Sequence, residues 1–252
     1  MVLYFTSTGN SKFIANKIAK DLNKDLISLN DIFKNNKNWE FHSTSPFILV
    51  SPIYAWRLPK KLENFLKTAK FNGNNEIYIL VTMGKDCGLT QKYCKKIIEN
   101  RNMILKGFEA INMPDNYFIG STMNSKEKSI EEIKQVIPKI DNIKNLISEN
   151  KSFFQNKYNK NDWFLSSIGN WGFNTFMANS KSFKVSNKCT KCKKCINNCP
   201  INNITLENEK IKFNNNCIFC LGCLHKCPVQ AIDYKGNIEK NGQYIFPKEL
   251  EI

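Results

Sequence analysis

The sequence predicts an α/β domain, built on a doubly wound parallel sheet of five strands, followed by a small α+β domain. Over the first 150 residues, short apolar runs alternate with stretches of helical periodicity. This alternation is typical of a parallel sheet that is covered by helices on both faces. From residue 189 onward, one cysteine pattern occurs twice instead. A chain of 252 residues has room for one large domain and one small domain.

Five apolar runs are the expected strands of the sheet. In chain order they are "VLYFT", "DLISL", "PFILVSP", "EIYILVTM" and "GFEAINMP". Apolar runs of this length, separated by helical segments, are typical of buried strands in a sheet. They therefore account for all five strands of the predicted α/β domain.

The segments between these runs show helical spacing. In "NSKFIANKIAKDL", apolar residues four apart predict a helix after the first strand, which Asn10 or Ser11 can cap. "LPKKLENFLKTA" and "LTQKYCKKIIEN" predict helices after the third and fourth runs. Isoleucines from Ser129 to Ile147 predict a long amphipathic helix, in which Pro138 is expected to produce a kink.

Domain boundaries follow from the change in composition. We expect a first domain at 1–150, a helical connector at 151–182, and a second domain with a C-terminal tail at 183–252. The connector is rich in aromatic residues, which we expect to cover the seam between the domains: Trp163, Phe164, Trp171, Phe173 and Phe176. A docking face for a partner or a membrane surface is the alternative.

The chain is strongly basic, with a formal net charge of +15. Lys and Asn are frequent in helices and loops alike, which favours a coding bias as the source of this charge. Attraction of an acidic redox partner is the functional alternative. No nucleic-acid-binding module or dense basic arm is recognisable, so no nucleic acid partner is expected.

The cysteines indicate where the protein works and what it binds. No secretory signal and no apolar run of transmembrane length is visible, so we expect a cytoplasmic protein with no transmembrane segment. Eight of the ten cysteines lie between residues 189 and 227. Thiols stay reduced in the cytoplasm, and this crowding therefore points to metal ligands rather than disulfides. The oligomeric state cannot be predicted.

Both cysteine runs, "CTKCKKCINNCP" and "CIFCLGCLHKCP", have the spacing C-x2-C-x2-C-x3-C-P. This pattern resembles the bacterial ferredoxin signature for iron-sulfur clusters. The repeat continues through "CPINNI" and "CPVQAI", so each half is expected to be a cluster loop followed by a short helix and a strand. Zinc sites also use C-x2-C spacing, but they pair two such knuckles rather than a triplet and C-P.

In two-cluster ferredoxins, the fourth cysteine of each run binds the other cluster. The resemblance therefore implies two crossed ligand sets. The first set is Cys189, Cys192, Cys195 and Cys227. The second set is Cys217, Cys220, Cys223 and Cys199.

A second motif, "YFTSTGNSKF", follows the first strand and opens the first helix. Backbone N–H groups and the helix dipole favour a phosphate there, and Gly9 permits the tight turn. Neither G-x-G-x-x-G nor the Walker pattern is present, so a dinucleotide or ATP is not indicated. The loop resembles the phosphate loop of flavodoxins, which bind FMN; an ordinary capped helix is the alternative.

Two further loops follow the third and fourth strands, where a doubly wound sheet binds its ligand. "SPIYAWRLP" offers Tyr54 and Trp56 as rings that can stack on an isoalloxazine, and "TMGKDCG" offers N–H groups near Gly84. "MPDNY" adds Tyr117. The expected FMN contacts are Thr6, Ser7, Thr8, Gly9, Asn10, Ser11, Pro52, Ile53, Tyr54, Ala55, Trp56, Thr82, Met83, Gly84 and Tyr117.

With these motifs, the chain resembles the family in which a flavodoxin-like domain precedes a two-cluster 4Fe-4S ferredoxin domain. The resemblance implies a flavodoxin-like sheet, a ferredoxin-like 2x(4Fe-4S) domain, one FMN and two 4Fe-4S clusters. It implies an electron-transfer protein that converts between two-electron and one-electron carriers, with a redox partner protein that is acidic if the charge is functional. The alternatives are a flavin-free scaffold carrying a ferredoxin, and an FMN-dependent reductase of a small molecule.

No catalytic acid-base group stands out in the sequence. His225 lies within the second cysteine run and is expected to be exposed. Cys87 and Cys94 lie outside the runs and are expected to be packing residues.

Overall fold

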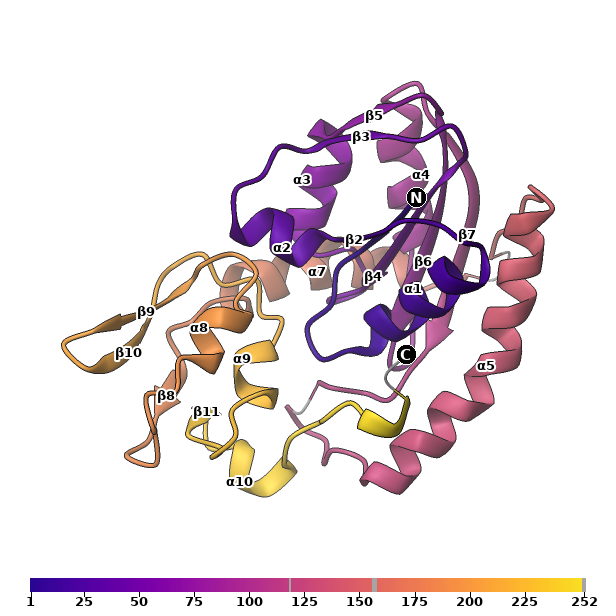
Figure 1. The fold of residues 1–252 in the computed structure, drawn as a ribbon. Helices are drawn as coiled ribbons and strands as arrows, with labels where there is room; N and C mark the ends of the chain where they lie inside the picture. Colours follow the sequence, from indigo (N-terminus) through magenta and orange to yellow (C-terminus); the bar gives the residue numbers. More distant parts are fainter. Residues whose placement is uncertain (118, 156–157, 251–252) are drawn as a thin grey trace.

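A computed structural model describes residues 1–117, 119–155 and 158–250. Its larger part is a five-stranded parallel sheet in the order β2-β1-β4-β6-β7 (Figure 1). The strands are β1 (Val2–Tyr4), β2 (Leu26–Ser28), β4 (Phe47–Pro52), β6 (Glu76–Met83) and β7 (Ile104–Asn112). Numbered within this sheet alone, the order is 2-1-3-4-5, which is the flavodoxin order. The predicted doubly wound sheet is confirmed.

Helices cover both faces of this sheet. One face packs against α1 (Asn10–Asp21) and α5 (Lys126–Ser148). Helix α5 continues through Pro138. The other face packs against α2 (Leu29–Lys34), α3 (Lys60–Thr68) and α4 (Thr90–Glu99). Two separate hydrophobic cores result, one on each side of the sheet.

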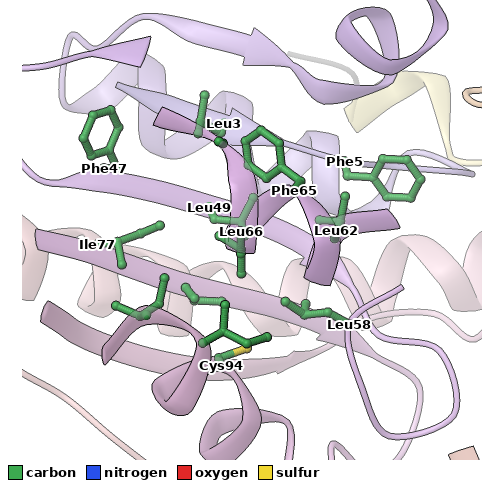
Figure 2. Packing of buried hydrophobic residues seen from close by; sticks show 14 of the residues in the cluster. Leu3, Phe5, Phe47, Leu49, Leu58, Leu62, Phe65, Leu66, Ile77 and Cys94 are labelled. Atoms are coloured by element: carbon green, nitrogen blue, oxygen red, sulfur yellow. The ribbon is translucent and has the colours of Figure 1, made fainter. Parts of the chain in front are cut away.

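Strand β4 shows how one sequence serves both cores. Phe47 and Leu49 point into the core beneath α3, whereas Ile48 and Val50 point into the core beneath α1, and all four side chains are fully buried. Figure 2 shows the first of these cores, with strand residues facing Leu66 of α3. Each such side chain contributes about 1.5–3 kcal/mol through burial. A strand buried on both faces has no polar alternation, so it appears in the sequence as a continuous apolar run.

Three elements of this larger part were not predicted from the sequence. They are helix α2 and two short strands, β3 (Glu40–His42) and β5 (Lys70–Asn72), which form a separate parallel pair. Each strand has only three residues and carries polar side chains at its ends. The strand pair is stabilised by its two central residues, Phe41 and Phe71, whose rings stack on each other and pack against Phe65.

The connector contains one helical run from Asp162 to Met177 in which α-helical and π-helical turns alternate. The segments are α6 (Asp162–Phe164), η1 (Leu165–Gly169), α7 (Asn170–Gly172) and η2 (Phe173–Met177), of which η1 and η2 are π-helical. π-Helical turns are rare and are often found at functional sites.

The expectation that the connector aromatics cover the domain seam is wrong for four of the five residues. Trp163, Phe164, Trp171 and Phe176 are between 54% and 68% exposed. Phe173 alone of these five packs toward the second domain, with its ring 5.7 Å from that of Phe219. The sequence shows that the helix is rich in aromatics but not which side of it faces the protein.

The C-terminal part contains two antiparallel strand pairs and short helices. The strands are β8 (Phe183–Val185) with β11 (Ile232–Tyr234), and β9 (Ile204–Glu207) with β10 (Lys210–Phe213). The helices are α8 (Lys194–Asn198), α9 (Gly222–His225), α10 (Ile238–Asn241) and the 3-10 turn η3 (Lys248–Leu250).

The predicted 28-residue repeat is present in the backbone. Helices α8 and α9 begin 222 − 194 = 28 residues apart, and strands β9 and β11 begin 232 − 204 = 28 residues apart. Each helix already contains the third cysteine of its run, whereas the sequence predicted a helix after the run. Left-handed residues occur in pairs at the same offset, namely Lys191 and Phe219, Lys193 and Leu221, and Asn202 and Gln230.

Polar contacts at α2 hold the two parts together. The Lys34 ammonium donates hydrogen bonds to the carbonyls of Ile196 (2.8 Å) and Asn197 (2.9 Å), at the end of α8. The Asn202 amide donates in return to the carbonyl of Lys34 at 2.7 Å. A cation at a helix C-terminus is favourable because the last carbonyls lack intrahelical partners.

The C-terminal tail forms a second connection, because it runs back to the first domain (Figure 1). The Tyr244 hydroxyl donates a hydrogen bond to the Asn10 side chain at 2.6 Å. Phe246 packs against Phe13, and a Cβ added at Gly9 would lie only 2.8 Å from the Phe246 Cβ. The tail therefore covers the turn that leads into α1.

We expect Tyr244→Phe to lower the melting temperature by about 2–4 °C, because losing this buried hydrogen bond costs about 1 kcal/mol. Thermal unfolding of the intact protein, followed by circular dichroism without oxygen, measures the change. Ile245→Ala is the matched control, since Ile245 is the next residue and is 65% exposed. Equal melting temperatures for Tyr244→Phe and the wild type would contradict the tail's role in stability.

Candidate functional site

A cavity of about 660 Å³ opens at the carboxyl edge of the main sheet. This edge is where doubly wound sheets bind their ligands, and the volume is within the usual range for a cofactor site. Ten of the predicted FMN contacts line the cavity: Asn10, Pro52, Ile53, Tyr54, Ala55, Trp56, Thr82, Met83, Gly84 and Tyr117. The three loops predicted to meet at this edge therefore do meet.

The other five predicted contacts, Thr6, Ser7, Thr8, Gly9 and Ser11, are not in the cavity lining. They form the turn from β1 into α1, immediately before and after Asn10. The first N–H groups of a helix have no intrahelical acceptor, so this turn retains donors for an anion.

The capping prediction for α1 is wrong. The N-cap is Gly9, with φ of 125°, and it makes no side-chain capping hydrogen bond. Asn10 and Ser11 lie inside the helix and bond outward instead. The Asn10 amide donates to the Pro114 carbonyl at 2.9 Å, and the Ser11 hydroxyl pairs with that of Thr82 at 2.8 Å. The two side chains therefore tie the turn to the loop after β7 and to the end of strand β6, both of which line the cavity.

The loop after β4 contains a strained two-residue turn. Tyr54 and Arg57 exchange backbone hydrogen bonds of 2.8 and 3.3 Å, while Ala55 and Trp56 between them have φ of 46° and 62°. Such turns favour Asn and Gly at these positions, because a side chain in the left-handed region costs about 1–2 kcal/mol. The Asn170 amide donates to the carbonyls of Tyr54 and Ala55, which holds the turn in place.

Two glycines make room for the Trp56 side chain. A Cβ at Gly88 would lie 2.9 Å from the Trp56 Cβ and would collide with the Ser166 hydroxyl, and Gly88 has φ of 52°. A Cβ at Gly169 would lie 3.4 Å from the Trp56 ring. Ser166 is fully buried and accepts a hydrogen bond from the Leu89 N–H at 2.8 Å. Trp56 is therefore enclosed between the loop after β6 and the connector helix.

We expect Gly88→Ala to reduce the free energy of unfolding by about 2–4 kcal/mol, combining the steric clash with left-handed strain. Gly236→Ala is the matched control, because Gly236 also has a positive φ of 75° but has nothing within 4 Å of an added Cβ. This control should lose only the strain contribution, about 1 kcal/mol. Thermal denaturation compares the two variants. Equal losses in the free energy of unfolding would show that Gly88 is not packed against Trp56 and Ser166.

The Tyr54 hydroxyl is a buried donor without a hydrogen-bond acceptor among the described residues. The Ser7 side chain lies beside the Tyr54 hydroxyl but is not positioned to form a hydrogen bond with it. Burial, and secondarily the nearby thiol of Cys220, raise the pKa of Tyr54 well above its usual value. A buried O–H beside a cysteine run fits a site built to hold an acceptor, such as a cluster sulfur.

The sequence did not predict two parts of the cavity wall. One part comes from the second cysteine run and the other from the connector helix: Phe219, Cys220 and Leu221, and Gly169, Phe173 and Met177. These segments lie more than 50 residues along the chain from the loops that they face, and no local pattern records such a contact. The remaining lining residues extend the loops already predicted: Lys85, Asp86, Met113, Pro114, Asp115 and Asn116.

The eight clustered cysteines surround two smaller cavities in the crossed arrangement. One cavity is lined by Cys189, Cys192, Cys195 and Cys227, and the other by Cys199, Cys217, Cys220 and Cys223. All ten cysteines are free thiols. Among the described residues, no three His, Cys, Asp or Glu side chains form a site for one metal ion. Four thiols at the corners of a cubane cluster lie farther apart than the ligands of a single ion.

Comparisons with known families agree with this geometry. Residues 1–102 match the model of a flavodoxin domain, and residues 188–232 match that of a 4Fe-4S dicluster domain. The chain is a flavodoxin domain followed by a 4Fe-4S ferredoxin domain. No curated protein matches the chain. Within the described parts of the chain, no helix is long and apolar enough to cross a membrane.

Backbone N–H groups already point at sulfur in the ferredoxin domain. The Asn203 and Ala231 N–H groups, 28 residues apart, donate to the thiols of Cys199 (3.2 Å) and Cys227 (3.3 Å). Such N–H bonds stabilise ligating thiolates and raise the reduction potential of a cluster. The donor set therefore fits a 4Fe-4S cluster at each position.

The two cysteine sets differ in their surroundings. Cys192 of the first set is exposed, and its pKa is lowered by the Lys194 backbone N–H and, to a smaller extent, by the Lys194 charge. In the second set, burial raises the pKa of Cys220 to about 12 and that of Cys217 to about 11. The first set therefore reaches the surface of the ferredoxin domain at Cys192, whereas the second set meets the flavodoxin loops at Cys220.

The prediction that His225 is exposed is wrong. It is 2% exposed, because α9 faces the flavodoxin domain. Its Nε2 lies 2.7 Å from the Asn116 carbonyl, and its Nδ1 accepts from the Tyr244 N–H at 3.0 Å. Burial lowers the pKa of His225 to about 4, so the neutral ring joins the two domains. Cys87 and Cys94 are buried, as predicted.

Paired substitutions test the crossed ligand sets. We expect Cys199→Ala with Cys220→Ala to leave about four irons per chain, because both ligands belong to one cluster. Cys199→Ala with Cys192→Ala should leave almost none, because one ligand is lost from each cluster. Iron and acid-labile sulfide analysis of anaerobically purified protein distinguishes them. The reverse result would show that each run holds its own cluster.

Proposed function

We propose that this protein relays electrons between an FMN in the cavity at the sheet edge and two 4Fe-4S clusters held by the crossed cysteine sets. One observation carries the proposal. Cys220 of the second set, with its neighbours Phe219 and Leu221, lines the same cavity as the flavodoxin loops. No separate docking of the two domains is needed to bring the sites into contact.

The flavodoxin loops would hold FMN through stacking and backbone donors. Tyr54 and Trp56 line the cavity and offer rings for stacking. The backbone at Gly84 lies close to the Asp115 side chain, since a Cβ added at Gly84 would lie 2.9 Å from the Asp115 carboxylate. The N–H groups at the start of α1 that follow Gly9 would receive the phosphate, since the Gly9 N–H itself donates to the Thr6 hydroxyl at 3.1 Å. FMN exchanges one or two electrons whereas each cluster exchanges one, so the pair converts between the two kinds of carrier.

The surroundings of the two cysteine sets suggest an order for the relay. Cys220 of the second set lines the cavity together with the flavodoxin loops. The first set lies at the surface beside Lys191, Lys193 and Lys194, and Cys192 is exposed. A redox partner protein with an acidic surface would therefore dock at the first set, attracted by these lysines.

The composition of the anaerobically purified protein is the first test. We expect about one FMN with roughly eight irons and eight sulfides per chain, following from two cubane clusters. Full iron with no FMN, even after reconstitution with excess flavin, would contradict the relay. That result would support a ferredoxin carried on a flavin-free scaffold.

The order of the relay is tested with the variant that combines Cys199→Ala and Cys220→Ala. FMN is reduced first, by a light-driven flavin donor, and the cluster signals are followed by electron paramagnetic resonance. In the wild type both clusters should be reduced. In the variant, the remaining first cluster should be reduced at least about tenfold more slowly, because the intervening cluster is missing. Equal rates would contradict the order.

A further inference from the structure

The helical run from Asp162 to Met177 carries an unusual exposed surface. Its outer side chains form what we call the aromatic face: Trp163 (61% exposed), Phe164 (54%), Ile168 (47%), Trp171 (62%) and Phe176 (68%). Single exposed apolar side chains are common on proteins, but a contiguous group of this size indicates an interaction surface.

The π-helical turns bring these side chains to one side of the helix. Trp163 and Ile168 are five residues apart, as are Trp171 and Phe176, and the rings of Trp171 and Phe176 lie 5.8 Å apart. A wider helical turn aligns residues at this spacing, whereas an α-helix would rotate them apart. The π-helical geometry therefore widens the apolar stripe.

The opposite side of the helix is firmly attached to the protein. Ser166 and Asn170 are buried there and bond to the loops after β6 and β4, through Leu89, Tyr54 and Ala55. These bonds fix the rotation of the helix about its axis. The aromatic face is consequently held outward by the same contacts that shape the cavity.

The charged residues along this part of the chain are almost all basic. The sequence from 151 to 184 contains five lysines and one acidic residue. That acid, Asp162, is 2% exposed, whereas Lys160 and Lys181 at the two ends of the run are exposed. Exposed Trp and Phe bordered by lysine are typical of helices that lie in the surface of an anionic membrane.

We propose that the aromatic face binds the surface of membranes that contain anionic lipids. Trp and Phe rings would enter the headgroup region, and the lysines near the surface would be attracted to the anionic headgroups. The other side of the same helix contributes Gly169, Phe173 and Met177 to the cavity wall. Binding would therefore hold the cavity about one helix diameter, ~10–12 Å, from the lipid.

Vesicle flotation tests this proposal with the intact protein. The probes are vesicles of phosphatidylcholine alone and of phosphatidylcholine with about a third phosphatidylglycerol. We expect flotation with the second kind, weakened at high salt because the attraction is partly electrostatic. Trp171→Ser with Phe176→Ser should lower the partition coefficient by about tenfold or more, since two large side chains lose their burial.

Ile245→Ser is the matched control, because Ile245 is 65% exposed but lies in the C-terminal tail. It should float as the wild type does, and iron content and melting temperature should be unchanged in both variants. Equal flotation of the double variant and the wild type, or no flotation at all, would overturn the proposal. So would light scattering that shows the wild type to be a dimer and the double variant a monomer, since a second copy would then cover the face.

Discussion

The arrangement depends on the close approach of the second cysteine loop to the turn after β1. At Gly222, which opens α9, an added Cβ would lie 3.3 Å from the Ser7 carbonyl, so there is little room for a side chain. This approach places Cys220 in the wall of the cavity at the sheet edge. A larger residue at this point would push the second cysteine loop away from the flavodoxin domain.

Directional polar contacts select one arrangement of the domains. His225 lies between the loop after β7 and the tail, Tyr244 bonds to Asn10 at the start of α1, and Lys34 meets the end of α8. Apolar surfaces alone can slide past one another, whereas buried donors and acceptors become costly when they lose their partners. The cavity therefore keeps its shape because hydrogen bonds join the two domains at three places.

Much of the fold could be predicted because the relevant patterns are local. Continuous apolar runs indicated the buried strands, and the resemblance of the cysteine runs to ferredoxins implied the two sets of cysteines that line the two small cavities. Helix α2 and the β3–β5 pair were missed because they are short and gain their burial from distant aromatics such as Phe65. The exposure of Trp171 and the burial of His225 were also missed, since both depend on which surface meets another domain.

The candidate site was predicted on one side only. The loops at the sheet edge follow from strand order, and their residues were identified in the sequence. The wall formed by Phe173 and Phe219 follows from domain docking, which no local motif records. The left-handed turn at Ala55 and Trp56 was unexpected for a similar reason, because its strain is balanced by Asn170 from the connector.

The 28-residue backbone repeat places one loop design in two very different settings. Paired positions share positive φ values between 49° and 60°, yet Lys193 occupies the position that Leu221 occupies in the other copy. The lysine copy faces water and the leucine copy faces the flavodoxin domain. Loop geometry suited to a cubane cluster is thus common to both copies, while a few side chains decide whether a copy meets water or the neighbouring domain.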